Sequence, residues 1–232
     1  TGSHGQSLET TLAQVLADER RIDIAHISFH QGHGTPYGFG TGGSRSAVIA
    51  GGAARASASV VREKILAVAA HLLEAAPADL FIENGVVTVI GTPSRSLTLA
   101  AVAEAAYKDP ASLSPEIERG LEHTARYQAP AVVHSNAAHV CTCEVDIHTG
   151  IVTLLRYIVS QDCGVMVNPM VVEGQIHGGL AQGIGQALSE ICQYDSVSGQ
   201  ILTGSFMDYA MPRADMMPNV IHDVSLVPTQ TN

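Results

Sequence analysis

Two glutamines and a row of glycines between Asp162 and Glu190 have the residue types and spacing of a ligand-binding helix. Gln175 and Gln182 are seven residues apart, so on a helix they share a face and could direct two amides at one polar ligand. Asn168-Pro169 predicts the start of this helix. Each glycine costs about 1 kcal/mol relative to alanine inside a helix, and close approach of another backbone or a flat ligand would offset that cost. The alternative is a tightly packed core helix. The glycines are Gly174, Gly178, Gly179, Gly183 and Gly185.

Two other segments place backbone amides where they could hold an anion. Residues 5–7 (G-Q-S) precede a predicted helix with Ser7 as its N-cap, and so lie at the positive end of the helix dipole. Residues 30–43 carry six glycines and lead through S-R-S into an alanine-rich helix predicted at 47–76. The segment lacks the lysine of a P-loop, so Arg45 would supply the charge. Ordinary capped helices and a solvated arginine are the alternatives.

The elements that must position these residues alternate between strands and helices. The sequence predicts a strand at 22–29, hairpins at 81–90 and 137–159, and a short helix at 97–108. A Gly51-Gly52 pair predicts close packing against the long helix. This order of elements favours an α+β fold over a parallel, doubly wound sheet.

Composition excludes several functions. There are 22 acidic against 12 basic residues and no lysine or arginine stripe, so binding to a nucleic-acid backbone is not expected. No apolar run reaches the roughly 18 residues of a membrane helix, so no membrane insertion is expected. The four cysteines form no paired framework and no signal pattern is visible, which favours the cytoplasm. Cys141 and Cys143 have no second pair at zinc spacing, so we predict that they pack in the interior rather than bind metal.

Six motifs follow one another along almost the whole chain. Together they resemble the C-terminal, molybdopterin-binding part of the large subunit of molybdenum hydroxylases, the xanthine dehydrogenase and aldehyde oxidase family. Within that family they are most similar to carbon monoxide dehydrogenase-like large subunits. The motifs are G-S-H-G-Q (Gly2 to Gln6), T-P-Y-G-F-G-T-G-G-S-R-S (Thr35 to Ser46), E-V-D-I-H-T-G (Glu144 to Gly150), D-C-G-V-M-V-N-P (Asp162 to Pro169), E-G-Q-I-H-G-G-L-A-Q-G-I-G-Q-A-L (Glu173 to Leu188) and F-M-D-Y-A-M-P (Phe206 to Pro212).

The resemblance implies two α+β lobes of the aldehyde oxidase/xanthine dehydrogenase molybdenum-cofactor-binding domain type. The first lobe would span 1–110, the connection 111–136 and the second lobe 137–232. The implied cofactor is molybdopterin cytosine dinucleotide, with Gln6, Ser44 and Gln182 converging on one cleft. The resemblance assigns no catalytic residue and no protein ligand to the metal. The implied cofactor-binding residues are Gly5, Gln6, Ser7 and Gln182 near the pterin, Gly43, Ser44, Arg45 and Ser46 at the pyrophosphate, and Asp162 and Asn168 at the nucleotide end.

The resemblance also implies a function and partners. The chain would be a fragment of a large subunit that oxidises a small molecule, namely CO, an aldehyde or an N-heterocycle, with oxygen derived from water. The remainder of the large subunit and iron–sulphur and FAD subunits would be its partners. The family's catalytic glutamate would follow V-P-T-Q-T-N, after Asn232, so we expect the isolated chain to lack cofactor and activity. A separately encoded subunit of a split hydroxylase and a non-catalytic binding module are the alternatives.

Overall fold

The chain divides into two compact units, unit 1 (Thr1–Ala129) and unit 2 (Pro130–Asn232). The computed structural model describes residues 1–32, 38, 40–109, 111–129 and 134–227. Each unit combines helices with a three-stranded sheet, so the predicted α+β class is confirmed. Within the described ranges, the helices are too short or too polar to cross a membrane.

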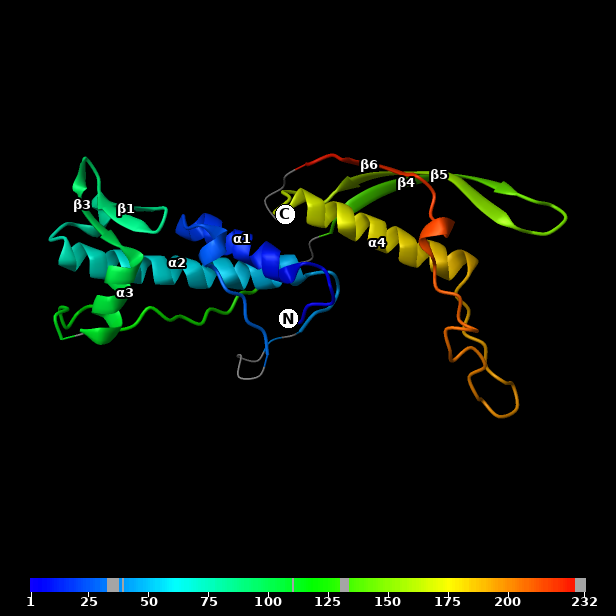
Figure 1. The fold of residues 1–232 in the computed structure, drawn as a ribbon, viewed down its shortest axis with the longest axis horizontal. Helices are drawn as coiled ribbons and strands as arrows, with labels where there is room; N and C mark the ends of the chain where they lie inside the picture. The colour runs from blue at the N-terminus through cyan, green and yellow to red at the C-terminus, as the bar shows by residue number, and fades with distance from the viewer. Residues whose placement is uncertain (33–37, 39, 110, 130–133, 228–232) are drawn as a thin grey trace. The chain divides into compact units, whose positions relative to one another are not determined.

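Unit 1 is built on one long helix that supports a small antiparallel sheet (Figure 1). The sheet has the order β1-β2-β3. Along the chain its elements are α1 (Leu8–Arg20), the 3₁₀ turn η1 (Ile24–His26), α2 (Ser46–Leu72), the 3₁₀ turn η2 (Pro77–Asp79), β1 (Leu80–Glu83), β2 (Val86–Val89), β3 (Thr92–Thr98) and α3 (Leu99–Lys108).

Helix α2 forms where the sequence predicts it but ends earlier, at Leu72 instead of Ala76. Glu74 adopts a left-handed backbone with φ of 49°, which stops the helix. Val61, Ile65 and Val68 lie one helical turn apart and are buried against the sheet and α3. This face is the core of unit 1.

Glycine gives α2 one close contact, as the Gly51-Gly52 pair predicts. A Cβ atom at Gly52 would lie 2.7 Å from Cζ of Tyr127 and closer still to two other atoms of that ring. A Cβ at Gly51 would meet no heavy atom within 4 Å. The close approach is therefore confirmed at Gly52, where a tyrosine ring occupies the space that a side chain would need.

The strand predicted at 22–29 is wrong. Asp23 Oδ1 accepts a hydrogen bond from Ala25 N at 2.9 Å and starts the turn η1 instead. Alternation of apolar and polar residues predicts a strand only where a partner strand can pair with it, and none of the described residues pairs with this segment. The local side-chain hydrogen bond therefore decides the backbone conformation.

The hairpin predicted at 81–90 is confirmed as β1 and β2. Asn84 and Gly85 both have positive φ, 49° and 75°, as a type I′ turn requires. The third strand, β3, is not predicted, because it contains Pro93 and most of its side chains are exposed. Thr98 accepts a hydrogen bond from Ala101 N at 3.2 Å and so caps α3.

Residues 111–129, expected within the connection between lobes, lie in unit 1. Leu113 belongs to the core cluster of this unit. Lys64 on α2 is buried, and its Nζ donates to Glu118 Oε1 at 2.5 Å and to the carbonyl oxygen of Glu122 at 2.9 Å. The segment is thus bound to α2 by one charge-assisted contact and by apolar packing.

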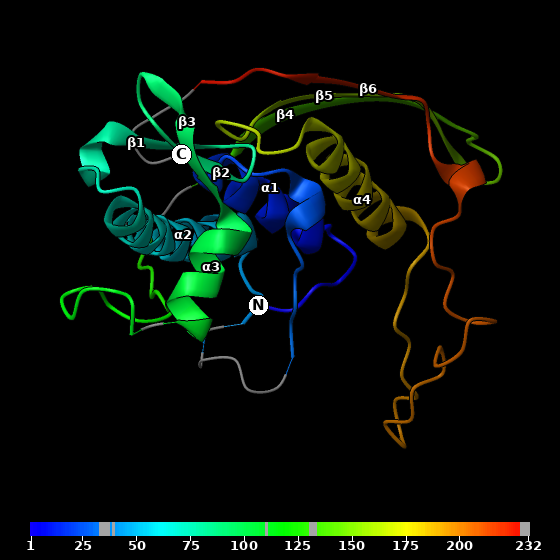
Figure 2. The same ribbon diagram turned by 60° about the vertical axis from the view of Figure 1, so that its left-hand side comes forward.

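Unit 2 is a three-stranded mixed sheet with one helix across it (Figures 1 and 2). The order is β4-β5-β6, antiparallel between β4 and β5 and parallel between β5 and β6. The predicted hairpin and the helix start at Asn168-Pro169 are confirmed. The elements are β4 (Asn136–Val145), β5 (Val152–Asp162), α4 (Pro169–Leu188), the 3₁₀ turn η3 (Ala214–Met216) and β6 (Val220–Val224).

The core of unit 2 is small. Val159 from β5 and Ile176 and Leu180 from α4 are its buried members. Every residue of β4 is exposed, because the packing of α4 involves β5 and β6. Cys141 and Cys143 lie on β4, so the prediction that they pack in the interior is wrong for this chain.

Candidate functional site

Residues 43–46 form the turn at the N-terminus of α2. Gly43 and Ser44 adopt left-handed backbones, with φ of 61° and 55°, and turn the chain into the helix at Ser46. Arg45 occupies the N-cap, and no side chain caps this end of the helix. A cation beside the positive end of a helix dipole is unfavourable by itself, whereas an anion between the two interacts favourably with both. The predicted residues 43–46 therefore lie together on one electropositive turn.

The N-terminal loop lies against the segment that leads into this turn. Gly2 N donates to Thr41 Oγ1 at 2.8 Å, and that hydroxyl donates to the carbonyl oxygen of Gly2 at 2.7 Å. Ser3 N donates to Gln31 Oε1 at 3.0 Å. The two residues of each bond are 39 or 28 positions apart in sequence, and the bonds bring the loop that carries Gln6 to the chain just before the α2 turn.

Gln6 closes its own loop. Its Nε2 donates to the carbonyl oxygen of Gly2 at 3.3 Å, and its Oε1 accepts from His4 N. Gly5 has a φ of 94°, which glycine adopts without strain. Ser7 is the N-cap of α1, as predicted, but its backbone is left-handed and its side chain forms no capping hydrogen bond.

In unit 2, the turn from β5 to α4 is held by two predicted residues. Asp162 Oδ1 accepts from Gly164 N at 3.0 Å and from Val227 N at 3.2 Å. Asn168 Oδ1 accepts from Val171 N at 3.2 Å and caps α4. Both side chains thus shape the turn, and their role toward a nucleotide stays a prediction. Burial, aided by the negative charge of Asp162, raises the pKa of the Cys163 thiol between them.

Four of the five glycines of α4 leave the helix surface around them open. A Cβ atom at any of the first four would meet nothing within 4 Å. A Cβ at Gly185 would lie 2.8 Å from Cδ of Pro212. Within the described chain, close approach therefore accounts for Gly185 alone. Gly174 and Gly183 are nine residues apart, so at 3.6 residues per turn they lie on opposite sides of the helix, and the four open glycines do not form one face. These four are Gly174, Gly178, Gly179 and Gly183.

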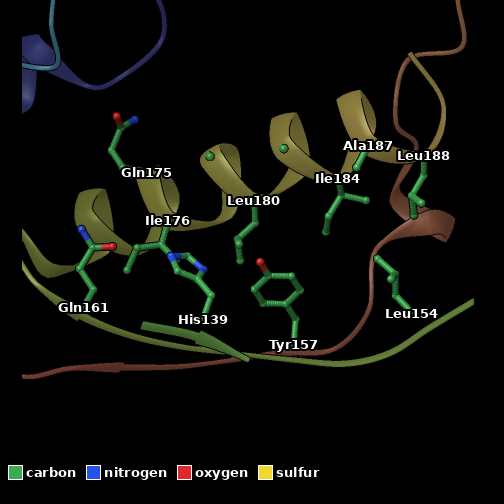
Figure 3. A pocket seen from close by; sticks show the side chains of 12 residues that line it. His139, Leu154, Tyr157, Gln161, Gln175, Ile176, Leu180, Ile184, Ala187 and Leu188 are labelled. Atoms are coloured by element: carbon green, nitrogen blue, oxygen red, sulfur yellow. The ribbon is translucent and has the colours of Figure 1, made fainter. Parts of the chain in front are cut away.

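A groove of about 570 Å³ runs between α4 and the sheet of unit 2 (Figure 3). Leu180 and Ile184 point from the helix towards Tyr157 and Leu154 on β5. The rings of His139 and Tyr157 meet edge to face, with centroids 5.9 Å apart. The other lining residues are Gln161, Gln175, Ile176, Gly179, Gly183, Ala187 and Leu188.

The sequence predicts only some of the residues that line this groove. Gln175 lines it, whereas Gln182 is exposed outside it. His139, Tyr157 and Gln161 are not anticipated. In the β4–β5 ladder, His139 pairs with Val159 and Cys141 pairs with Tyr157. His139 and Tyr157 are therefore diagonal neighbours across the two strands. Recognising them would require the strand register, which the sequence does not state.

The predicted site residues fall into two sets. One set lies in unit 1, on the N-terminal loop and the α2 turn. The other set lies in unit 2, where Gln182 is 14 residues along α4 from Asn168, roughly 21 Å at the helical rise. Since Gln182 belongs to a different unit, its convergence with Gln6 and Ser44 stays a prediction. Of the T-P-Y-G-F motif, residues 35–37 and 39 lie outside the described residues.

Comparison with known proteins gives consistent matches. The family model described as the molybdopterin cofactor-binding domain matches residues 1–218. The nicotine 6-hydroxylase large subunit of Paenarthrobacter nicotinovorans is 43% identical over 218 residues, 93% of this chain and 27% of that protein. The carbon monoxide dehydrogenase large chain of Afipia carboxidovorans is 36% identical over 231 residues, 99% of this chain and 28% of that protein.

A solved structure matches equally well. Quinoline 2-oxidoreductase from Pseudomonas putida 86 aligns with a TM-score of 0.87 at 39% identity, over 99% of this chain and 29% of that one. The chain thus spans less than a third of the length of each of these relatives.

Proposed function

Because the chain belongs to the molybdopterin cofactor-binding domain family, we propose that it forms part of a molybdopterin dinucleotide site in the large subunit of a molybdenum hydroxylase. We further propose the cytosine form of the dinucleotide. The family match over residues 1–218 is the observation that carries this proposal. The electropositive turn at the start of α2 supports it from the geometry of unit 1.

The residues present fit a pterin dinucleotide. The first-turn amides of α2, together with Arg45 and Ser46, offer the donors and charge that a pyrophosphate needs. Gly179 and Gly183 of α4, four residues apart on one side of the helix, leave room for a flat ring. Gly5 to Ser7 and Gln182 would then address the pterin, with Asp162 and Asn168 at the nucleotide end.

When bound, the molybdenum of such a cofactor supplies two-electron oxidation of a small molecule with oxygen derived from water. The residues of this chain would bind and orient the cofactor. Relatives named for nicotine, carbon monoxide and quinoline favour an N-heterocycle or CO as substrate, and an aldehyde remains within the class. The remainder of the large subunit, together with iron–sulphur and FAD subunits, would complete the enzyme in the cytoplasm.

The test compares two arginines on the same helix in the complete large subunit. Arg45→Ala removes the charge at the α2 N-terminus. Arg55→Ala removes an exposed charge that pairs with Glu19 at 3.3 Å, farther along α2. A charge-assisted contact contributes about 1.5–3 kcal/mol, so Arg45→Ala should weaken cofactor binding by about tenfold or more. Arg55→Ala should retain the cofactor.

Two measurements report the outcome. Elemental analysis gives the molybdenum content, and acid hydrolysis releases the nucleotide for chromatography. Equimolar cytidine monophosphate is expected from the parent protein. Release of guanosine or adenosine monophosphate would contradict the cytosine form alone. Equal molybdenum content in the Arg45→Ala and Arg55→Ala proteins would contradict the pyrophosphate site.

A further inference from the structure

We propose that Glu173, His177 and His222 form a binding site for a divalent transition-metal ion, with Zn²⁺ as the fitting ion. Each residue offers one ligand atom, and these atoms all lie within 4.8 Å of one another. Among the residues that the structure describes, no other group of three such side chains comes together in this way. Glu173, His177 and His222 are not among the residues proposed above for the pterin dinucleotide.

Regular elements hold all three side chains. Glu173 and His177 are four residues apart on α4 and therefore share one face, a turn apart. His222 lies on β6 at the position between Val220 and Val224, whose side chains pack against the core beneath α4. The strand alternation thus directs His222 to the same side of the sheet as the helix. Ligands on a helix and a strand are held more firmly than ligands on loops.

The contacts between the three side chains leave space for an ion. His222 Nε2 and Glu173 Oε1 are 4.0 Å apart, too far for a hydrogen bond. The rings of His177 and His222 meet edge to face, with centroids 5.7 Å apart. Zinc binds these ligand atoms at about 2.0–2.2 Å, so two atoms that share one ion lie at most about 4.3 Å apart. The Glu173–His222 separation already meets that limit.

Small side-chain rotations would complete the site. The largest separation, up to 4.8 Å, must close by about 1.4 Å to reach the tetrahedral spacing of roughly 3.4 Å. The His222 and Glu173 side chains are 29% and 48% exposed, so neither is fixed by a closely packed core. Exposed side chains exchange between rotamers within picoseconds to nanoseconds, so this adjustment is accessible.

The ligand types select the class of ion. Two imidazoles and one carboxylate suit zinc and its first-row neighbours, whereas magnesium and calcium prefer oxygen ligands alone. Three protein ligands leave a fourth position for water or for a group of another molecule. The expected ligand is therefore Zn²⁺, with Co²⁺ as its spectroscopic substitute.

The experiment titrates metal into the purified chain after removal of metal with a chelator. Cys141 and Cys143 are exposed thiols that would compete for zinc, so both are replaced by serine in every protein tested. Calorimetry with ZnCl₂ should show one equivalent bound, and CoCl₂ should give the visible absorption of a low-symmetry, four-coordinate site. His148, exposed in the β4–β5 turn, serves as the matched histidine control through His148→Ala.

His222→Ala and Glu173→Gln should each weaken zinc binding by about tenfold or more, since even residues behind the ligands contribute that much. His148→Ala should bind as the parent does. If His222→Ala loses its helical circular dichroism, the test rests on Glu173→Gln. This variant should stay folded, because an amide has the size of the carboxylate and the Glu173 side chain is half exposed. Absence of zinc binding in the parent, or parental affinity in a folded Glu173→Gln protein, would overturn the proposal.

Discussion

At the scale of single residues, the structure separates one cysteine from the other three. Cys141, Cys143 and Cys192 are exposed, whereas Cys163 is half-buried and burial raises the pKa of its thiol, with the charge of Asp162 acting in the same direction. The thiolate is the reactive form. We expect iodoacetamide at pH 8 to alkylate Cys163 last, as followed by peptide mass spectrometry. In the denatured chain the difference should vanish, and fast labelling of native Cys163 would contradict the prediction.

A second residue-scale prediction concerns Asp195. Hydrogen bonds from the backbone and hydroxyl of Ser198, and then from Val197 N, hold the pKa of its carboxyl below the ordinary value. A lowered folded pKa stabilises the loop above the unfolded value of about 3.9. That contribution is lost as the pH falls through the folded pKa. We expect the NMR titration midpoint of Asp195 in the chain to lie below its midpoint in the isolated peptide Tyr194–Ile201.

The same residues supply the control. Asp195→Asn keeps an oxygen acceptor but removes the ionisation, so the amide shift of Ser198 should no longer titrate in this range. Equal midpoints in the chain and the peptide would show that the hydrogen bonds around Asp195 do not form in solution.

Single residues also show how much of the structure can be predicted from the sequence. Asn84-Gly85 and Asn168-Pro169 specify a turn and a helix start through local chemistry, and the hairpin predicted at 81–90 and the predicted helix start are confirmed. Ser7 occupies the predicted cap position, yet its backbone is left-handed and its side chain forms no capping hydrogen bond. His139 and Tyr157 become neighbours through a strand register that no local signal sets.

At the scale of elements, the glycines of α4 can be replaced to measure their effect on stability and on cofactor binding separately. Gly178→Ala and Gly183→Ala place a methyl group where nothing lies within 4 Å, so each should raise the free energy of unfolding by about 1 kcal/mol through helix propensity. Urea unfolding followed by circular dichroism measures this. In the complete large subunit, Gly183→Ala should lower the molybdenum content if the cofactor packs against this part of α4.

Gly185→Ala is the matched control on the same helix. Its methyl group would lie 2.8 Å from Cδ of Pro212 and 3.1 Å from Oε1 of Glu190. Overpacking of this kind costs about 1–3 kcal/mol, so this variant should be less stable than the parent. Equal changes in the free energy of unfolding for Gly178→Ala, Gly183→Ala and Gly185→Ala would show that neighbouring atoms surround all three positions in solution.

Elements are predictable where sequence period and packing agree. Helix α2 and the β1–β2 hairpin combine a clear period with a buried face, and they form. The β4–β5 hairpin also forms, although every residue of β4 is exposed. Apolar and polar residues alternate in the segment 22–29, yet it has no partner strand among the described residues. β3 (T-P-S-R-S-L-T) and β6 (V-I-H-D-V) pair with other strands although their apolar and polar residues do not alternate clearly. Strand propensity therefore misleads in both directions. Pairing across the chain, rather than local preference, decides these cases.

At the scale of the whole molecule, the two units differ in how much apolar surface they bury. The core of unit 1 joins α2, α3 and the β1–β2–β3 sheet, whereas the core of unit 2 rests on Val159, Ile176 and Leu180. Local opening requires less free energy where fewer apolar contacts are lost. Hydrogen–deuterium exchange should therefore reach the amides of β5 and α4 well before those of α2 and β2. Equal protection in both units would contradict this.

The exposed strand β4 has a consequence for handling the chain. It lies at one edge of its sheet, so the backbone groups on its outer side have no paired strand in the described part of the chain. Such an edge is a template for strand addition by another molecule, and N-A-A-H-V-C-T-C-E-V, which has one acidic residue and no proline or glycine, offers little to prevent it. In a longer polypeptide, whatever covers this edge would also act as a guard against cross-β aggregation. Storage life in concentrated solution would then depend on hydrogen-bonding groups that take no part in binding or chemistry.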